Sequence, residues 1–295
     1  MHPRVELFGY QIDAIRMGDA VRRLLTWIAA EEPLCRYVVT PNVDHTVMLH
    51  ERADFRKTYD DAGMILADGM PIVLASRLLK KPLPERVTGA DLVYALFDAA
   101  NVFCRTQRGS DISHRELCLI GANSTHSELT TDHAWQESCE AGKPLQRQLR
   151  VYLLGAGPGV AERAAANIDA RWPAVAVVGT YSPPLGFEQD EHQNEEILGR
   201  IAAVQPDVVV VGLGAPKQEL WVHRHRFLIQ ARVALCVGAA IDFLAGEKPR
   251  APAWMQSTGL EWLYRLLSEP RRLARRYARD AWIFPRIVWN EWRQS

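Results

Sequence analysis

The sequence predicts an α/β fold: a Rossmann-like parallel sheet with helices on both faces, followed by a helical C-terminal appendage rich in arginine and tryptophan. Three observations predict it. Short, almost continuously apolar runs end in turns and lead into helical patterns, which is typical of parallel strands buried on both faces. The chain has 295 residues, 48% of them hydrophobic, enough for a large core. After Pro252 the composition changes, which marks the appendage.

The strand and helix patterns alternate along the chain. In order, the strand candidates are "RYVV" before "TPNVDHTVMLHERADFRKTYDDAG", "GMILAD" before "GMPIVLASRLL", "VYLLGAGPG" before "VAERAAANIDARW", "DVVVVGLGAP" before "KQELWVHRHRFLI", and "ALCVGAAIDF". Ligands of such sheets bind beyond the carboxyl ends of the strands, so residues just after each run are the site candidates. We expect residues 1–250 to form the core and 251–295 the appendage. Residues 101–149 show no clear period and are interpreted as an insertion.

Charge and cysteine usage limit the class of protein. The chain has 35 Lys plus Arg and 35 Asp plus Glu, which argues against a nucleic-acid partner, since that needs a basic contact surface. Five scattered cysteines without a CxxC pair predict reduced thiols in the cytoplasm, with neither a zinc site nor a disulfide framework. The N-terminal stretch lacks the apolar segment of a signal peptide, and no stretch is apolar enough for a membrane span.

The positive charge is concentrated in the appendage. Residues 250–295 contain nine arginines, four acidic residues and five of the nine tryptophans. On a helix, Arg272, Arg275, Arg276 and Arg279 would share one face. Such a face is either simply solvated or, with the tryptophans, lies on an anionic membrane leaflet.

The stretch "VVVVGLGAPKQELW" predicts a phosphate-binding turn. Gly212 and Gly214 allow a sharp turn and close approach to a ligand, and Pro216 suits the first turn of a helix. The free N–H groups of that helix would favour phosphate, and Lys217 would add charge. The alternative is a plain strand-to-helix turn in which Glu219 favours the helix dipole.

A second glycine-rich turn, "LLGAGPGV", begins at Gly155. It departs from the GxGxxG spacing of dinucleotide-binding folds because its third glycine comes one residue early. No acidic residue suited to the ribose follows on the next strand. A dinucleotide-dependent oxidoreductase is therefore a rival interpretation with a weaker basis.

Polar residues follow two other predicted strands. Asp68, in "ILADGMPIV", is placed either to act as a general base or to cap the next helix. Thr40 and Asn42, in "VVTPNVDH", can likewise bind a ligand or cap a helix. "ERVTGADL" offers Arg86 and Asp91 for an ion pair across a turn. No DxD, HExxH or P-loop motif occurs, so a diphosphate site would be built without the usual acidic pair for a metal, and arginines are the obvious substitute.

Taken together, these stretches resemble the WecG/TagA/CpsF family of bacterial glycosyltransferases, which transfer N-acetylmannosamine, its uronic acid or, in xanthan-type members, glucose. The matching segments are "TPNVDH", "LADGMPIV", "ERVTGADL", "LLGAGPGV", "GLGAPKQELW", "VGAAIDFLAG" and "RAPAWMQSTGLEWLYRLLSEPRRLARRY". They cover most of the chain apart from its first residues, the predicted insertion and about the last dozen residues.

The resemblance implies an inverting, metal-independent transferase without a cofactor. It would move a sugar from a UDP-sugar to a polyprenyl-diphosphate-linked sugar at the cytoplasmic leaflet, in exopolysaccharide or cell-envelope synthesis, as a peripheral membrane protein. The family's proposed base falls on Asp68, its T-x-N motif on Thr40 and Asn42, its core arginine on Arg86, and the glutamine of its PKQE motif on Gln218.

The remaining family positions concern the nucleotide and the diphosphate. The aspartate associated with the nucleotide falls on Asp242, and the aromatic residue expected to stack on uracil falls on Phe187. The appendage arginines fall on Arg265, Arg272 and Arg275, which the resemblance assigns to the diphosphate or the acceptor.

Three points stay open at this stage. A membrane-attached nucleotide-binding module of a polysaccharide complex is the rival without catalysis. The predicted insertion, residues 101–149, is a candidate for controlling homo-oligomer formation or acceptor access. No residue is diagnostic of the donor sugar.

Overall fold

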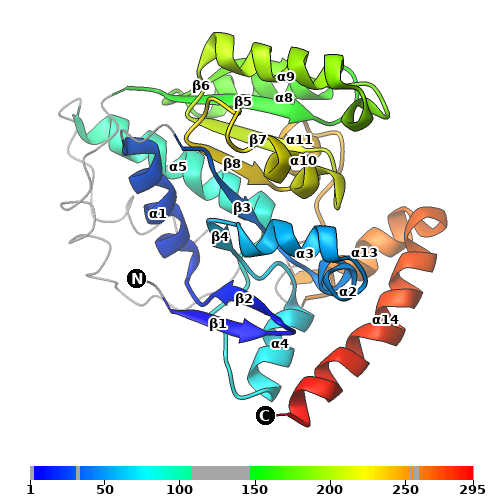
Figure 1. Cartoon of the computed structure of the whole chain (residues 1–295). Coiled ribbons are helices and arrows are strands. Elements are labelled where there is room, and N and C mark those ends of the chain that lie inside the picture. The colour runs from blue at the N-terminus through cyan, green and yellow to red at the C-terminus, as the bar shows by residue number, and fades with distance from the viewer. Residues whose placement is uncertain (1–2, 31–33, 108–146, 253, 256–258, 295) are drawn as a thin grey trace.

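The computed structural model describes residues 3–30, 34–107, 147–252, 254–255 and 259–294 (Figure 1). In this part of the chain six parallel strands form one sheet in the order β4-β3-β8-β7-β5-β6. The strands are β3 (Arg36–Val39), β4 (Met64–Ile65), β5 (Leu149–Gly155), β6 (Val175–Tyr181), β7 (Val208–Gly212) and β8 (Val233–Cys236). This confirms the predicted α/β fold.

Helices cover both faces of the sheet, and each face has its own apolar core (Figure 1). One core contains residues of α1 (Met17–Ala29), α5 (Gly89–Gln107), α8 (Val160–Arg171) and α11 (Ala240–Leu244). The other contains residues of α2 (Val43–Glu51), α3 (Ala53–Asp60), α4 (Met70–Leu78), α9 (Glu191–Val204), α10 (Lys217–His225) and the short 3₁₀ helix η1 (Phe187–Gln189).

The continuous run of valines in β7 is explained by the burial of this strand on both faces. Val208 and Val210 point into the first core, whereas Val209 and Val211 point into the second. Successive strand residues face opposite sides, so a strand covered on both faces has no polar side. All four valines are fully buried.

An antiparallel hairpin precedes the sheet. Strands β1 (Arg4–Leu7) and β2 (Tyr10–Asp13) are joined by Phe8 and Gly9, both at positive φ, as two-residue hairpin turns require. The apolar side chains of the hairpin enter the second core. Asp13, at its end, accepts a hydrogen bond from the backbone N–H of Ile65 (2.8 Å) and so fixes the hairpin to β4.

Two helices, α13 (Glu261–Ser268) and α14 (Pro270–Trp292), lie at the C-terminal end beside the α/β layers, and α14 packs against the second core through Ile287 (Figure 1). We call them the C-terminal helices. α14 contacts the hairpin through Phe284, whose ring centroid lies 5.5 Å from that of Phe8, and through Glu291, which accepts a hydrogen bond from the Phe8 backbone N–H. No helix of the described residues is both long and apolar enough to cross a membrane.

The structure shows that the predicted insertion has narrower bounds than residues 101–149. Residues 101–107 continue helix α5, and Leu149 begins β5, so both ends of the predicted 101–149 segment belong to elements of the α/β core. Residues 108–146 lie outside the described part of the chain. The division into a core of residues 1–250 and an appendage of 251–295 remains a proposal.

Candidate active site

A cavity of about 670 Å³ lies at the carboxyl edge of the sheet, where the sequence placed the ligand site. Its walls are the loops that follow β3, β4, β7 and β8, together with the C-terminal helices. Of the predicted site residues, the structure brings these to the cavity: Thr40, Asn42, Asp68, Arg86, Gly212, Gly214, Gln218, Asp242 and Arg265.

Asp68 follows β4 and lines this cavity. Its backbone N–H donates to the carbonyl of Pro41 (2.8 Å), which joins the loops after β3 and β4. The N-cap of α4 is Gly69, at φ 149°, with no side-chain capping bond. Residues that carry a side chain rarely adopt this backbone conformation, which explains why position 69 is a glycine. The capping alternative for Asp68 is therefore wrong, and its carboxylate is left to the cavity.

The carboxylate of Asp68 is poised to take up a proton near neutral pH. Within the described residues, it has neither a hydrogen-bond nor an ion-pair partner. Burial, and next the negative charge of Glu261, raise its pKa to about 7, against the opposing effect of Arg86 and Arg265. A carboxylate with a pKa near the working pH is what general base catalysis favours.

The C-terminal region provides the ion-pair partners of two core residues beside Asp68. Arg86 Nη1 lies 3.3 Å from Glu261 Oε2, and Arg250 Nη2 donates to Asp91 Oδ1 at 2.7 Å. The sequence analysis offered an ion pair between Arg86 and Asp91. In the structure, Arg86 pairs with Glu261 and Asp91 pairs with Arg250. Both partners lie far along the chain, in the part that folds back onto this turn.

Thr40 and Asn42, after β3, both line the cavity. The Asn42 side-chain oxygen also accepts a hydrogen bond from the backbone N–H of His45 (3.1 Å), so Asn42 is the N-cap of α2. The two interpretations of this motif are thus compatible for Asn42, whose amide both caps a helix and borders the cavity.

The glycine turns after β7 and β8 form another wall. Gln218 bridges them, since its Oε1 accepts from the backbone N–H of Gly214 (3.2 Å) and of Gly238 (3.1 Å). Its Nε2 donates to Glu219 at 2.8 Å, which fixes the amide orientation. Asp242, in the first turn of α11, borders the same wall, with its Oδ2 3.7 Å from Lys248 Nζ.

Several predicted nucleotide-binding residues do not line the cavity. Phe187 is 2% exposed and packs on Trp221, with ring centroids 6.3 Å apart, so the structure does not place it to stack on uracil. Gly155 allows close strand contact instead, because a Cβ there would lie 2.6 Å from the backbone of Gly212. The others follow the glycine turn but face elsewhere: Pro216, Lys217, which pairs with Glu188 at 3.3 Å, and the fully buried Glu219.

The predicted appendage arginines differ in their position relative to the cavity. Arg265 lines the cavity, whereas Arg275 is exposed on α14 away from it. The side chain of Arg272 lies outside the described residues. The predicted basic face of α14 is therefore not uniform, and its neighbour Arg276 points to the cavity instead.

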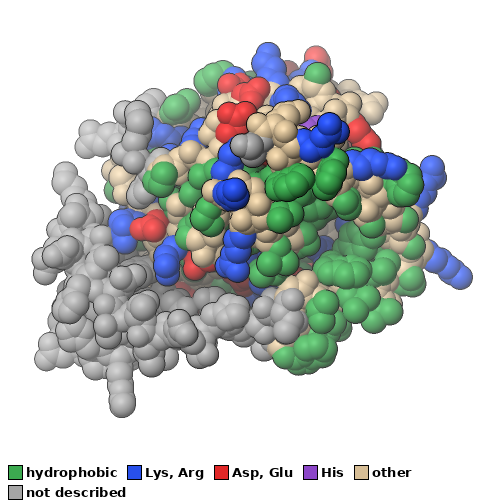
Figure 2. Space-filling view, turned by 90° about the horizontal axis from the view of Figure 1, so that it is seen from below, with side chains coloured by type: hydrophobic (Ala, Val, Ile, Leu, Met, Phe, Trp, Pro, Cys, Tyr) green, Lys and Arg blue, Asp and Glu red, His purple; other side chains and the backbone are tan. Residues whose placement is uncertain are grey.

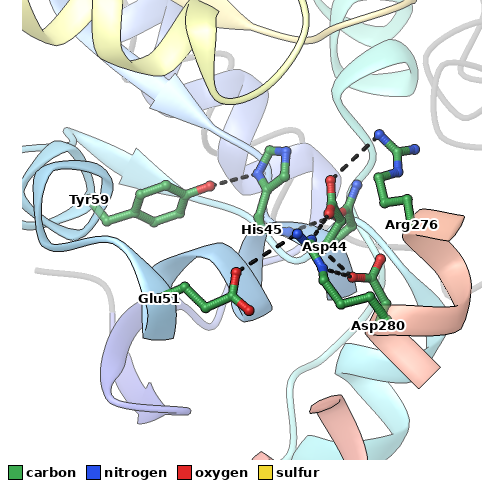
Figure 3. A network of polar contacts seen from close by, with 8 residues as sticks. Asp44, His45, Glu51, Tyr59, Arg276 and Asp280 are labelled. Atoms are coloured by element: carbon green, nitrogen blue, oxygen red, sulfur yellow. Dashed lines mark hydrogen bonds and ion pairs between the residues drawn. The ribbon is translucent and has the colours of Figure 1, made fainter. Parts of the chain in front are cut away.

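A network that the sequence analysis missed joins α14 to α2 (Figure 3). Arg279 Nη2 donates to Asp44 Oδ1 at 2.6 Å and to Asp280 Oδ1 at 3.2 Å. Arg276 Nη1 lies 3.5 Å from Asp44 Oδ2, and Arg279 Nη1 lies 3.8 Å from Glu51 Oε2. The network closes the α14 side of the cavity, which Asp44, Arg276 and Asp280 also line.

Burial dominates the electrostatics of this network. It raises the pKa of Asp280 to about 6, with a further contribution from the charge of Asp44, and it raises the pKa of Asp44 as well. His45, which shares a hydrogen bond of 2.7 Å with the Tyr59 hydroxyl, has its pKa lowered to about 3 by burial. His45 is thus neutral at physiological pH.

The cavity is lined by charged side chains of both signs. The basic ones are Arg86, Lys248, Arg250, Arg265 and Arg276, and the acidic ones are Asp44, Asp68, Asp242, Glu261 and Asp280. In the ranges that the structure describes, no group of three or more His, Cys, Asp or Glu side chains is arranged to hold a metal ion. Basic side chains around a cavity this large suit a substrate that carries a diphosphate.

Known proteins with similar sequences support this chemistry. The sequence profile of the Glycosyl transferase WecG/TagA/CpsF family matches residues 5–105 and 127–295. The chain is similar to an N-acetylglucosaminyldiphosphoundecaprenol N-acetyl-beta-D-mannosaminyltransferase of Staphylococcus aureus, with 26% identity over 92% of this chain and 87% of the relative. A protein of the same name from Bacillus spizizenii is 28% identical over 81% of this chain and 74% of that relative.

The cavity lies at the carboxyl edge of the parallel α/β sheet, where such sheets bind their ligands. The family match gives the class of enzyme. The chain belongs to the WecG/TagA/CpsF family, and it is a glycosyltransferase. The match omits residues 106–126, a shorter stretch than the predicted insertion.

Proposed function

We propose that this enzyme transfers a sugar from a UDP-sugar to a sugar linked to polyprenyl diphosphate, with inversion at the anomeric carbon and without a metal. The observation that carries the proposal is the unpaired carboxylate of Asp68, with a pKa raised to about 7, in a cavity lined by arginines. The proposal places the reaction in the synthesis of a cell-envelope polymer or exopolysaccharide.

The reaction assigns one task to Asp68. The acceptor hydroxyl attacks the anomeric carbon from the face opposite the UDP group, and a new C–O bond forms. The bond from that carbon to the diphosphate oxygen breaks, and UDP leaves with the electron pair. The hydroxyl proton passes to Asp68, which must therefore be ionised before the step.

Arginines would stabilise the departing diphosphate. Arg86 and Arg265 act on Asp68 from two sides, and Arg250 and Lys248 border the same cavity. Guanidinium groups bind phosphate oxygens bidentately and keep their charge at all physiological pH values. Their placement supports leaving-group stabilisation by side chains in place of a metal ion.

The donor nucleotide is assigned to the wall formed by the turns after β7 and β8. Gly212 and Gly214 line this wall without side chains, Gln218 holds the two turns together, and Asp242 presents a carboxylate for hydroxyl groups. Nucleotides bind at this edge in doubly wound sheets. The relatives' name supports an undecaprenyl-diphosphate-linked N-acetylglucosamine as the acceptor class.

We also assign a membrane surface to the molecule. Figure 2 shows hydrophobic side chains gathered over α4 and α14, with Lys and Arg side chains at their margins. The exposed large hydrophobic residues of these two helices are Leu74, Leu78, Trp282, Trp289 and Trp292. Arg286 stacks on Trp282, with its guanidinium carbon 3.7 Å from the ring centroid. Tryptophan beside arginine suits the interface of an anionic leaflet, where a lipid-linked acceptor would be.

The test is UDP release from a panel of UDP-sugars with a short-chain polyprenyl-diphosphate sugar acceptor and EDTA. We expect release from one donor only when the acceptor is present, and its loss in Asp68→Asn. Asp169→Asn, which changes an exposed carboxylate on α8, is the matched control and should keep full activity. Release that requires a divalent cation, or full activity of Asp68→Asn, would contradict the proposal.

The membrane surface has a separate test. Sedimentation with anionic phospholipid vesicles should recover the wild type, and a Trp282→Ser, Trp289→Ser variant should remain in solution while retaining activity on a water-soluble acceptor. Unchanged sedimentation of the variant would contradict this assignment.

A further inference from the structure

Helix α13 brings two opposite charges to the catalytic carboxylate. Arg265 and Glu261, four residues apart on this helix, both line the cavity and both act electrostatically on Asp68. Arg265 has an evident task at a diphosphate. Glu261 has none, since a carboxylate beside a bound diphosphate opposes binding. Its placement in the cavity therefore requires another explanation.

The explanation begins with the contact between Glu261 and Arg86. Glu261 Oε2 lies 3.3 Å from Arg86 Nη1, and the side chains are only 19% and 14% exposed. An ion pair so enclosed is less screened by solvent than one at the surface. It joins α13 to the loop before α5, directly beside Asp68.

We propose that Glu261 is a positioning residue for the reaction: it engages the Arg86 guanidinium, which would otherwise neutralise the Asp68 carboxylate. The inference rests on the proposed function, because it assigns Asp68 the role of base.

Among the charged residues around Asp68, Glu261 is the one that is placed to engage the Arg86 guanidinium. The groups that face Asp68 are Glu261 and Arg265 from α13, Arg86 from the preceding loop, and Asp91 from α5. Asp91 is already engaged, by Arg250 at 2.7 Å and by the Thr88 hydroxyl at 2.7 Å. Without the carboxylate of Glu261, the guanidinium of Arg86 would therefore face Asp68 with no competing anion.

The consequence for the chemistry is a stronger base. Glu261 raises the pKa of Asp68, whereas Arg86 lowers it. A base of lower pKa is already ionised at lower pH but accepts a proton less readily in the transition state. Because Glu261 lies on a C-terminal helix, Asp68 would reach its full basicity only when that helix is docked on the core.

The test is the pH profile of kcat/KM for Glu261→Gln, which keeps the size and removes the charge. We expect the acid limb of the profile to move down by about one pH unit, with a fall in the plateau rate of about tenfold. In Glu261→Asp, which retains the carboxylate, the acid limb should lie close to its position in the wild type.

Glu51→Gln is the matched control. Glu51 also pairs with an arginine of the C-terminal helices, Arg279, at 3.8 Å, but it does not line the cavity. Its substitution should leave the acid limb where it is. An unmoved limb in Glu261→Gln would overturn the inference, because Glu261 would then have no influence on the base. An equal shift in Glu51→Gln would also overturn it, because the shift would then be a general effect of helix docking.

A second measurement separates this inference from the proposed function. In protein labelled with ¹³C at the aspartate carboxyl carbons, the Asp68 resonance is identified by its absence in Asp68→Asn. Its titration midpoint should fall by about one unit in Glu261→Gln, and an unchanged midpoint would overturn the inference. If the wild type transferred no sugar, the proposed function would fail, and this titration would still decide what Glu261 does to Asp68.

Discussion

Two walls of the cavity are built in different ways. The wall of the turns after β7 and β8 is mostly backbone, with Gly212, Gly214 and Gly238 held together by one glutamine, Gln218. The opposite wall is made of side chains, in which Asp44 of α2 meets Arg276, Arg279 and Asp280 of α14. The comparison teaches that the two walls are sensitive to different changes. The integrity of the backbone wall depends on the close fit of its turns, whereas that of the side-chain wall depends on charges that come together from distant parts of the chain.

The largest effect is expected between the two walls, at Asp68. Asp68→Asn removes the proton acceptor without changing size, and kcat should fall by about 10³-fold because general base catalysis contributes 10² to 10⁴. UDP binding, measured by calorimetry, should change little, since the backbone wall is intact. A matching loss of UDP affinity would mean that Asp68 belongs to the nucleotide wall.

The pH dependence of the wild type addresses the same residue. Because the base must be ionised and its pKa is raised to about 7, kcat/KM should rise with pH and level off above about pH 7. A flat profile between pH 5 and 8, measured by initial rates of UDP release, would show that Asp68 titrates near the value of an ordinary carboxyl group.

Arg279→Ala should have the next largest effect, on the side-chain wall. It removes the cation nearest to the buried carboxylates of Asp44 and Asp280 and leaves Arg276, 3.5 Å from Asp44, as the remaining one, although Arg279 itself is 38% exposed and partly screened. We expect a loss of about 2 kcal/mol in the free energy of unfolding, measured in urea. The double variant with Asp44→Ala should lose less than the sum of the single losses, because the second change removes one unpaired charge. Additive losses would show that the two side chains act independently.

Gly212→Ala tests the backbone wall and should be milder. The added methyl group would lie 2.9 Å from the Gly238 carbonyl oxygen and 2.9 Å from Ile241 Cδ1, so the two turns must move apart. UDP affinity should fall about tenfold, equivalent to about 1.4 kcal/mol. Gly199→Ala on α9, where an added Cβ meets nothing within 4 Å, is the control and should bind UDP normally. Equal affinity in both variants would mean that this wall tolerates changes of shape.

The smallest expected effect is that of Asp280→Asn on stability. The pKa of this carboxyl is 3.8 in its ordinary state and about 6 in the folded protein, so the folded protein holds the proton more tightly. The folded state therefore loses stability as pH rises from about 4 to 6, and the loss persists above pH 6. The full shift would correspond to about 3 kcal/mol. Because Asp280 borders a cavity open to solvent, which screens its charge, we expect Asp280→Asn to be more stable than the wild type by about 1 kcal/mol at pH 7.5 and equal to it below pH 4. A difference that is independent of pH would exclude this titration as its cause.

The contrast between the walls also explains what could be predicted from the sequence. The strands, the glycine turns and Asp68 are signalled by neighbouring residues, since a buried apolar run followed by a turn is a local pattern. Asp44 and Arg279 are separated by 235 positions, and Arg86 and Glu261 by 175, so no local pattern connects them. The family resemblance could identify Arg265 but could not reveal which acidic residues would oppose it.

The errors have physical reasons as well. Phe187 lies after a strand, as a nucleotide-stacking residue would, but its ring fills the space beside Trp221 in the core. The sequence alone predicts that Arg272, Arg275, Arg276 and Arg279 of α14 share one face. On the folded helix, Arg276 and Arg279 turn towards α2 because the buried carboxylate of Asp44 lies there, whereas Arg275 stays in solvent.

The docking of α14 has a consequence for the order of folding. Its ion pair with Asp44 spans 235 positions and its hydrogen bond with Phe8 spans 283, so both close very long loops. Contacts of such high order form late, because loop-closure entropy must be overcome before they contribute. Substitutions at these contacts should therefore act mainly on the unfolding rate and hardly on the folding rate. Helix α14 docks on α2 and on the hairpin, which must be in place before these contacts can form, so the enzyme would acquire its closed cavity late in folding.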